Sequence, residues 1–188
     1  LLAFRAGKPD AGPRLARGLE KLGPAYIKLG QMLATRPDVV GEHVASALEH
    51  LQDRLPPFSE AEARAEITRA FGKPVEQLFS GFGAPIAAAS IAQVHQAWTS
   101  LAAGNDAPSV RVAVKILRPG IRRQFARDLD ALAWAAHMAE SLSAEARRLR
   151  LVAIVETLAA SVALELDLRM EAAAAGELYE RTRGEAEF

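Results

Sequence analysis

Helical periodicity dominates the first 79 residues of the chain, and prolines and glycines divide this region into separate helices. Val40, Val44, Leu48 and Leu51 recur three or four residues apart, which places them on one face of a helix. Proline interrupts the pattern because it lacks the N–H group that a helix interior needs. The expected helices span residues 12–22, 24–36, 39–54, 59–71 and 74–79.

Two residues predict how individual helices in this region begin. Ser59 is followed three residues later by Glu62, which is the pattern of a capping box. Asp38 follows Pro37, and we expect its side chain to cap the helix that starts at Val39.

The middle of the chain changes to a strand pattern, and the pattern then returns to long helices. Strands are expected at residues 79–87, 91–99 and 110–117, with a loose hairpin loop at 101–109 that carries Gly, Asn, Asp and Pro. The helix expected at 121–142 has an apolar stripe that consists of Ile121, Phe125, Leu129, Leu132 and Ala136. The last helix, expected at 144–183, is long for a globular protein, so a break near Arg150 is expected.

Composition restricts the classes of function. The 188 residues are half hydrophobic, which is enough for one domain or two small ones. Lys plus Arg equals Asp plus Glu at 23 each, so the chain has no net positive field to recruit nucleic acid. No cysteine is present, which excludes disulfides and cysteine-ligated metals.

The most apolar stretch, 151–164, contains Glu156 and is too short for a membrane span. The chain opens on Leu1 without a signal peptide, as expected for an excised fragment.

A turn of small residues and a nearby lysine form the first candidate site. Ala87, Ala88, Ala89 and Ser90 lie between the first two expected strands, and Lys115 lies in the third. Small residues let backbone N–H groups approach phosphate oxygens, and a lysine supplies a positive charge for them. Taken singly, the alanine run is also typical of a packed segment, and the lysine is also typical of a strand exposed to solvent. Together they indicate a nucleotide-phosphate site, a layout that protein kinases use. The Ser90 hydroxyl is expected either to cap the turn or to contact a phosphate.

A second group of candidates lies on helices. Lys28 and Gln31 are three residues apart, so they share a helix face and are expected to reach one partner together. On a continuous final helix Asp167 and Glu171 share a face, whereas Glu165 points elsewhere, so the three carboxylates cannot all meet one partner.

Four motifs occur in a fixed order along the chain: KLGQ from Lys28, AAASIAQVH from Ala87, VAVKILRPGI from Val112 and ELDLRMEA from Glu165. With these motifs the chain resembles the UbiB family of atypical kinase-like proteins, which is associated with ubiquinone biosynthesis. The resemblance runs from about Leu19 to Glu177. It implies an α+β fold in which a helical N-terminal extension, residues 1–73, packs on a truncated protein-kinase-like small lobe, residues 74–188, made of a short antiparallel sheet and long helices.

The resemblance also implies roles for the candidate residues. Lys115 and Glu171 match the strand lysine and its partner glutamate and are the implied catalytic residues, and the alanine-rich turn with Lys115 is the implied nucleotide-binding site. Glu165 and Asp167 match the family's Glu-x-Asp motif, which faces KLGQ. Lys28, Gly30 and Gln31 would then form a lid over the cleft. A lysine in a closed cleft requires a carboxylate, and Glu165 is the natural candidate, with Asp167 as the alternative.

The implied cofactors are ATP and Mg²⁺, with the metal ligands expected outside this chain because no catalytic Asp loop follows Leu178. The fragment alone is therefore expected to be inactive, although the full-length protein would be a kinase or ATPase. Expected partners are a nucleotide and quinone-biosynthesis proteins or lipid, in the cytoplasm or at a membrane surface. The alternative is a non-catalytic helical scaffold or pseudokinase-like module. We assign no metal to His43, His50 or His137, and His95 is expected to be a packing residue.

Overall fold

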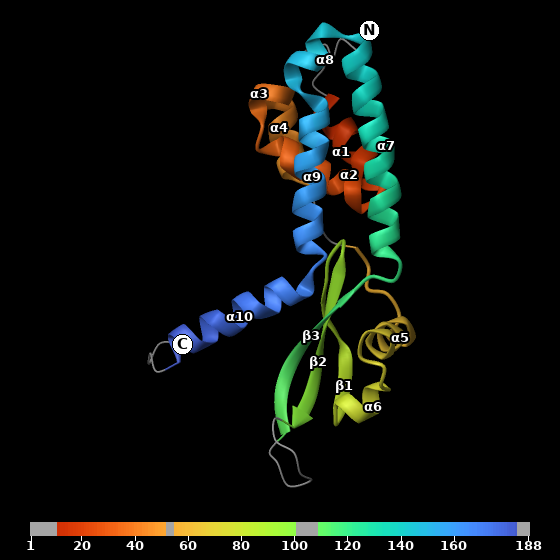
Figure 1. Cartoon of the computed structure of the whole chain (residues 1–188), viewed down its shortest axis with the longest axis vertical. Helices are drawn as coiled ribbons and strands as arrows, with labels where there is room; N and C mark the ends of the chain where they lie inside the picture. Colours follow the sequence, from red (N-terminus) through yellow and green to blue (C-terminus); the bar gives the residue numbers. More distant parts are fainter. Residues whose placement is uncertain (1–10, 52–54, 101–108, 184–188) are drawn as a thin grey trace.

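The computed structural model describes residues 11–51, 55–100 and 109–183. Within these ranges helices come first, a sheet follows, and longer helices end the chain (Figure 1). The early helices are α1 (Ala11–Leu22), α2 (Pro24–Ala34), α3 (Pro37–Val40), α4 (Glu42–Glu49), α5 (Glu60–Phe71) and α6 (Val75–Leu78). The strands are β1 (Gly81–Ala88), β2 (Ala92–Ser100) and β3 (Ser109–Leu117). The later helices are α7 (Ile121–Leu142), α8 (Ala144–Leu149), α9 (Leu151–Glu165) and α10 (Leu168–Thr182).

The three strands form one antiparallel sheet in the order β1-β2-β3. All three expected strands are confirmed to within two residues, and so is the α+β fold class. Across the sheet Ala87 pairs with Val94, and Val94 pairs with Lys115. Because directly paired residues project to the same face, this row brings the alanine-rich segment and the lysine onto one side of the sheet.

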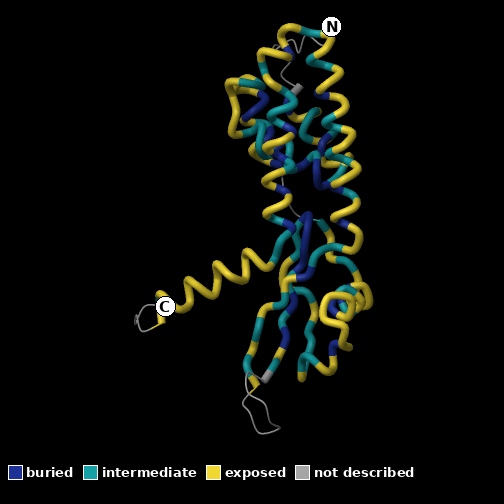
Figure 2. The backbone as a smooth tube through the Cα atoms, viewed as in Figure 1, coloured by how far each residue is buried: buried dark blue, intermediate teal, exposed yellow. Residues whose placement is uncertain are grey.

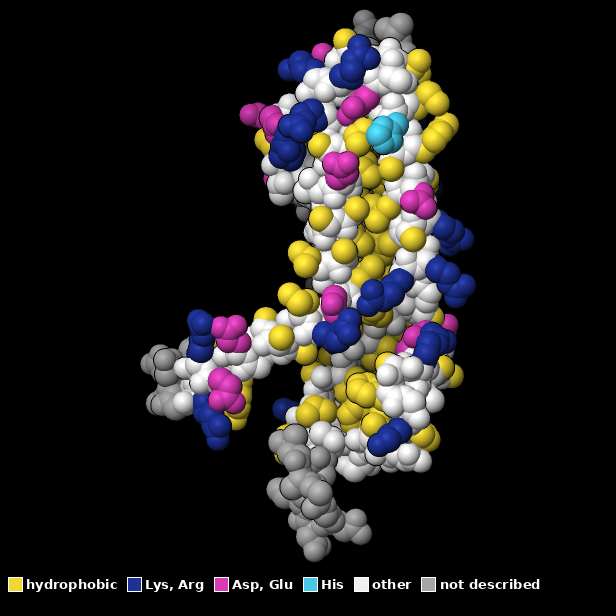
Figure 3. Space-filling view, in the orientation of Figure 1, with side chains coloured by type: hydrophobic (Ala, Val, Ile, Leu, Met, Phe, Trp, Pro, Cys, Tyr) yellow, Lys and Arg dark blue, Asp and Glu magenta, His cyan; other side chains and the backbone are white. Residues whose placement is uncertain are grey.

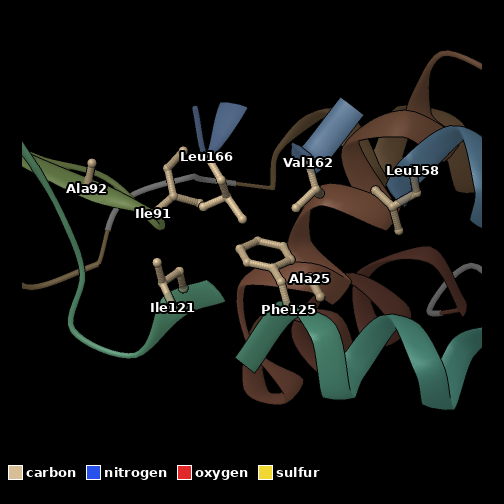
Figure 4. Packing of buried hydrophobic residues seen from close by; sticks show 8 residues of the cluster. All are labelled: Ala25, Ile91, Ala92, Ile121, Phe125, Leu158, Val162 and Leu166. Atoms are coloured by element: carbon tan, nitrogen blue, oxygen red, sulfur yellow. The ribbon is translucent and has the colours of Figure 1, made fainter. Parts of the chain in front are cut away.

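Two apolar clusters hold the helical part together. In the first, α2, α7 and α9 pack around Phe125, which also contacts the start of β2, and Figure 4 shows the Phe125 ring between Ile91 on one side and Val162 on the other. The second contains Leu19 of α1, Leu48 of α4 and Leu51, and Leu33 of α2 packs against it. On the face seen in Figure 3, hydrophobic side chains gather between α7 and α9. The N-terminal helices are therefore fixed to the long helices that follow the sheet.

A third cluster covers one face of the sheet. Ala63 and Ile67 of α5 pack with Ile116 of β3, and Val75 of α6 joins them. The capping box at Ser59 is confirmed, and α5 ends at Gly72 in the left-handed conformation. Although α5 falls within residues 1–73, it packs on the sheet and not on α1–α4 (Figure 1).

The expected helix from Val39 onwards is wrong in its boundaries. It is divided into α3 and α4 by Gly41, whose φ of +83° is outside the range of a right-handed helix and is easily reached only by glycine. Asp38 does not cap a helix; it lies in the first turn of α3 and pairs with Arg36. The expected end at Arg54 lies outside the described residues.

The expected final helix, 144–183, has two breaks where the sequence predicted one. The break at Arg150 is confirmed, with φ at +55°. The second follows Glu165, because the Asp167 side chain accepts a hydrogen bond from the backbone N–H of Arg169 and starts α10 anew. The α10 helix leaves the bundle at an angle (Figure 1) and is exposed along its length (Figure 2).

Candidate functional site

Lys115 lies on the face of the sheet that α5 does not cover. Its neighbours Val114 and Ile116 pack toward α5, and side chains alternate along a strand, so Lys115 points to the opposite side. Ala113, two residues earlier, is exposed on the same face. The strand therefore presents a lysine and a small apolar side chain on an open surface.

The Lys115 side chain forms an ion pair with Glu171 of α10. Its Nζ atom lies 2.6 Å from Oε2 and 2.9 Å from Oε1 of the glutamate. The expected partner is thus confirmed, and the contact spans 56 residues of sequence. The lysine side chain is 37% exposed and the glutamate 58%, so the pair contributes about 1 kcal/mol or less to stability. The ammonium group remains accessible to a ligand from solvent.

The alanine-rich segment forms the tight connection between β1 and β2. Ala87 and Ala88 belong to β1, and the Ala89 N–H donates to the carbonyl oxygen of Ala92 at 2.8 Å. Ser90 is fully buried, and its hydroxyl has no hydrogen-bond partner in the described structure. The expectation that this hydroxyl caps the turn is therefore wrong. Its role toward a phosphate stays a prediction.

Arg118 is a residue of this site that the sequence analysis missed. Its Nε atom donates to the carbonyl oxygen of Ala89 at 3.0 Å, and its Nη2 atom donates to that of Pro56 at 2.8 Å. The guanidinium carbon also lies 5.6 Å from the centre of the Phe58 ring. Arg118 stands within the motif VAVKILRPGI, but the sequence gives no sign that its side chain folds back onto the turn.

Lys28 of α2 forms an ion pair with Glu165 at the end of α9. The Nζ atom lies 2.8 Å from Oε2, and the side chains are 17% and 35% exposed, respectively. The pair is therefore more buried than that of Lys115 and Glu171, and it joins α2, which carries KLGQ, to the end of α9, where the Glu-x-Asp motif begins. Of the two expected carboxylates, Glu165 is the one in contact.

Asp167, the alternative partner expected for Lys28, instead caps α10. Its carboxylate caps α10, and the guanidinium of Arg169, 3.2 Å away, holds the pKa of this carboxyl below its ordinary value, assisted by the backbone N–H of the same residue. Arg122 of α7 donates to the carbonyl oxygen of Leu166, which fastens the corner between α9 and α10 to the bundle. The expectation of a continuous helix over Glu165, Asp167 and Glu171 is wrong, because α9 ends at Glu165 and Asp167 caps a new helix.

Gln31 and Gly30 serve the packing of α2. The Gln31 side chain donates to the carbonyl oxygen of Leu51 at 3.4 Å, so the expectation that Lys28 and Gln31 reach one partner together is wrong. A Cβ atom at Gly30 would lie 2.3 Å from Leu51 and 2.8 Å from Leu19. Gly30 therefore allows α2 to approach these two leucines closely.

His95 is a buried residue of the sheet with a hydrogen bond at each ring nitrogen. His95 is buried, donates from Nδ1 to the carbonyl oxygen of Gly83 at 2.8 Å, and accepts at Nε2 from Gln93 at 2.7 Å, which confirms it as a packing residue. No group of three potential metal-ligating side chains occurs among the residues described. Two cavities, of about 660 and 510 Å³, lie beside α8 and between α1 and α4, away from Lys115.

Comparisons with known proteins agree with this arrangement. A model of the ABC1 atypical kinase-like domain matches residues 50–188. A probable protein kinase UbiB from Azotobacter vinelandii is 42% identical over 184 residues, which cover 97% of this chain and 33% of the relative. The one from Marinobacter nauticus is 41% identical over 176 residues, or 93% of this chain and 31% of the relative. The chain thus spans about a third of the length of these relatives.

In the described ranges no helix has the length and apolarity to cross a membrane. With a family model that matches most of its length, this chain belongs to the ABC1 atypical kinase-like family.

Proposed function

We propose that this chain forms the ATP-binding part of a UbiB-like atypical kinase or ATPase that supports ubiquinone biosynthesis. The observation that carries the proposal is the ion pair between Lys115 and Glu171 on the open face of the sheet, in the same cross-strand row as Ala87. The names of the relatives, probable protein kinases, support the same reading.

The residues present fit the phosphates of a nucleotide. Lys115 offers an accessible ammonium group, and Glu171 orients it without covering it. The connection at Ala87, Ala88, Ala89 and Ser90 has small side chains, so a ligand can approach its backbone closely. ATP would supply the phosphoryl group, and Mg²⁺ would be held by residues outside this chain. Among the described residues no group of three potential metal-ligating side chains occurs.

We further propose that α2 acts as a lid beside the nucleotide site. Lys28 ties α2 to α9, and Leu29 packs on the cluster that contains Ile91, one residue beyond Ser90. A helix held at this position would restrict access by large substrates and favour small or lipid-like ones, as ubiquinone precursors are.

The test of the proposed function is the thermal stability of the full-length gene product with and without Mg²⁺ and ATP or ADP. Binding to the folded state alone raises the melting temperature as the nucleotide concentration exceeds the dissociation constant. We expect an increase with both nucleotides and none with adenosine at equal concentration. A folded protein with no increase would contradict nucleotide binding.

A non-catalytic scaffold is the second candidate, because one stripe of α7 is exposed and apolar. Trp134, Met138 and Leu142 recur four residues apart and are 67%, 43% and 79% exposed. Such a stripe is typical of a surface that docks a protein. If the thermal test gave no increase while the full-length gene product co-purified with a quinone-biosynthesis protein, the scaffold would be favoured.

A further inference from the structure

The side chain of Arg118 hydrogen-bonds to the backbone of the alanine-rich connection. Arg118 follows β3 directly and reaches two carbonyl oxygens on different segments, those of Ala89 in the connection and Pro56 ahead of α5. Its own backbone N–H donates to the carbonyl oxygen of Ile91 at 2.9 Å. Arg118 therefore contacts the connection on both sides of Ser90.

Apolar packing of Ile91 and Ala92 fixes one end of this connection, but few polar contacts fix its alanines and Ser90. Ser90 is fully buried, but its hydroxyl has no hydrogen-bond partner in the described structure. The alanines contribute no polar side-chain atoms, and the one backbone bond across the connection joins Ala89 to Ala92. The planar guanidinium of Arg118 presents donors in a rigid fork, and two carbonyl acceptors at 3.0 and 2.8 Å define its position.

Arg118 is also joined to Lys115 by a short piece of chain. Lys115 lies near the end of β3 and Arg118 directly follows the strand, so the residue that contacts the connection is only three positions from the residue that offers the ammonium group. The bonds from Arg118 to the carbonyl oxygens of Ala89 and Ile91 both oppose a displacement of the connection relative to Lys115.

We propose that Arg118 is a positioning residue, which holds the backbone of the alanine-rich connection at a fixed place relative to Lys115 so that the connection and the lysine ammonium group both meet the phosphates of one nucleotide. The inference rests on the proposed function and adds to it a residue that touches no ligand atom. The inference predicts that replacing Arg118 weakens the binding of ligands that carry phosphates and leaves the binding of the nucleoside alone unchanged.

The test compares ATP, ADP and adenosine binding to the full-length gene product by calorimetry, with Mg²⁺ present. For Arg118→Lys, which keeps the positive charge but loses the fork, and for Arg118→Gln, which loses both, we expect ATP to bind about tenfold more weakly. Adenosine affinity should stay within about twofold, a difference well below the tenfold that corresponds to 1.4 kcal/mol. Arg123→Lys and Arg123→Gln are matched controls, because Arg123 is exposed on α7 and not bonded to the connection; neither should change any affinity.

Amide hydrogen exchange without nucleotide gives a second readout that does not depend on binding. We expect Arg118→Lys to raise exchange at residues 88–92 and to leave α9 unchanged. Equal losses of affinity for ATP and adenosine would overturn the inference and show that Arg118 has a structural role only. Unchanged ATP affinity in Arg118→Lys would also overturn the inference. If the wild-type protein bound no nucleotide, the proposed function itself would fail, whatever the exchange data showed.

Discussion

At the scale of single residues, the two lysine–glutamate pairs differ mainly in burial. The pair of Lys115 and Glu171 is open to solvent and contributes little to stability, whereas Lys28 is 17% exposed and faces a glutamate that is 35% exposed. Removing one partner of a partly buried pair leaves the other charge without its counterpart, which is more destabilising than losing a surface pair. The pair of Lys28 and Glu165 should therefore support structure, and that of Lys115 and Glu171 should serve a ligand.

We predict that Lys28→Met lowers the free energy of unfolding of the 188-residue chain by about 1–2 kcal/mol, between the values for exposed and buried pairs. Urea denaturation measures this change, and limited proteolysis reports whether residues 24–36 become easier to cleave. Lys21→Met at the exposed end of α1 is the control and should have little effect. Equal stability of Lys28→Met and the wild type would show that the pair does not hold α2.

At the scale of elements, α2 is placed by a close approach at one glycine. Gly30 faces Leu51 and Leu19 at distances that leave no room for a Cβ atom, while Gly18 of α1 has no atom within 4 Å of such a position. The two glycines therefore make a matched pair, one required by packing and one free of it.

Gly30→Ala is predicted to destabilise the chain by about 1–3 kcal/mol, since both leucine side chains would have to move. Gly18→Ala is predicted to stabilise it by about 0.5–1 kcal/mol, because alanine is the better helix former and meets no neighbour. Urea denaturation of both variants tests the prediction. A stabilising Gly30→Ala would mean that α2 does not approach α4 and α1 closely.

The ionised form of Asp167 stabilises the start of α10 through its pairing with Arg169. Because Arg169 lowers the pKa of this carboxyl in the folded state, the contribution of the carboxylate to stability is complete above the ordinary value of 3.8 and is lost as the pH falls through the lower, folded-state pKa. Asp167→Asn still accepts a hydrogen bond at the cap but does not titrate. We predict that the stability advantage of the wild type over Asp167→Asn shrinks as the pH falls below about 3.8.

Urea denaturation at several pH values between about 5 and 3 measures that difference directly. Since all other carboxyl groups are common to both proteins, their titration cancels in the comparison. An advantage that stayed constant over this range would show that the Asp167 carboxylate is not bound in the folded state.

At the scale of the whole molecule, a helical bundle and a small sheet meet at the connection between β1 and β2. Ile91 and Ala92 belong to the same apolar cluster as Phe125 and Val162, so this connection is fixed to the bundle on one side (Figure 4). The face of the sheet with Lys115 stays open, and α10 leaves that junction with no buried residue (Figure 1). The nucleotide site of the proposal lies where the two parts join.

Local signals in the sequence predicted most of this arrangement. The capping box at Ser59 and the break at Arg150 depend on neighbouring residues only, and they are confirmed. The breaks at Gly41 and Asp167 were missed because the apolar pattern continues past them, and a single backbone or cap preference decides the outcome. The fold of Arg118 onto Ala89 depends on contacts between residues 29 positions apart, which periodicity does not contain.

The measurement that tests the central claim most directly is the affinity of the full-length gene product for ATP with Mg²⁺, in Lys115→Met and in Lys73→Met. Both lysines are exposed, but Lys73 lies beyond the end of α5 and takes no part in the site. If Lys115 holds the phosphates, Lys115→Met should weaken ATP binding by about tenfold or more, the equivalent of one lost charge-assisted hydrogen bond, while the melting temperature of the free protein stays close to that of the wild type. Lys73→Met should bind as the wild type does. Equal ATP affinity in the two variants would contradict the account.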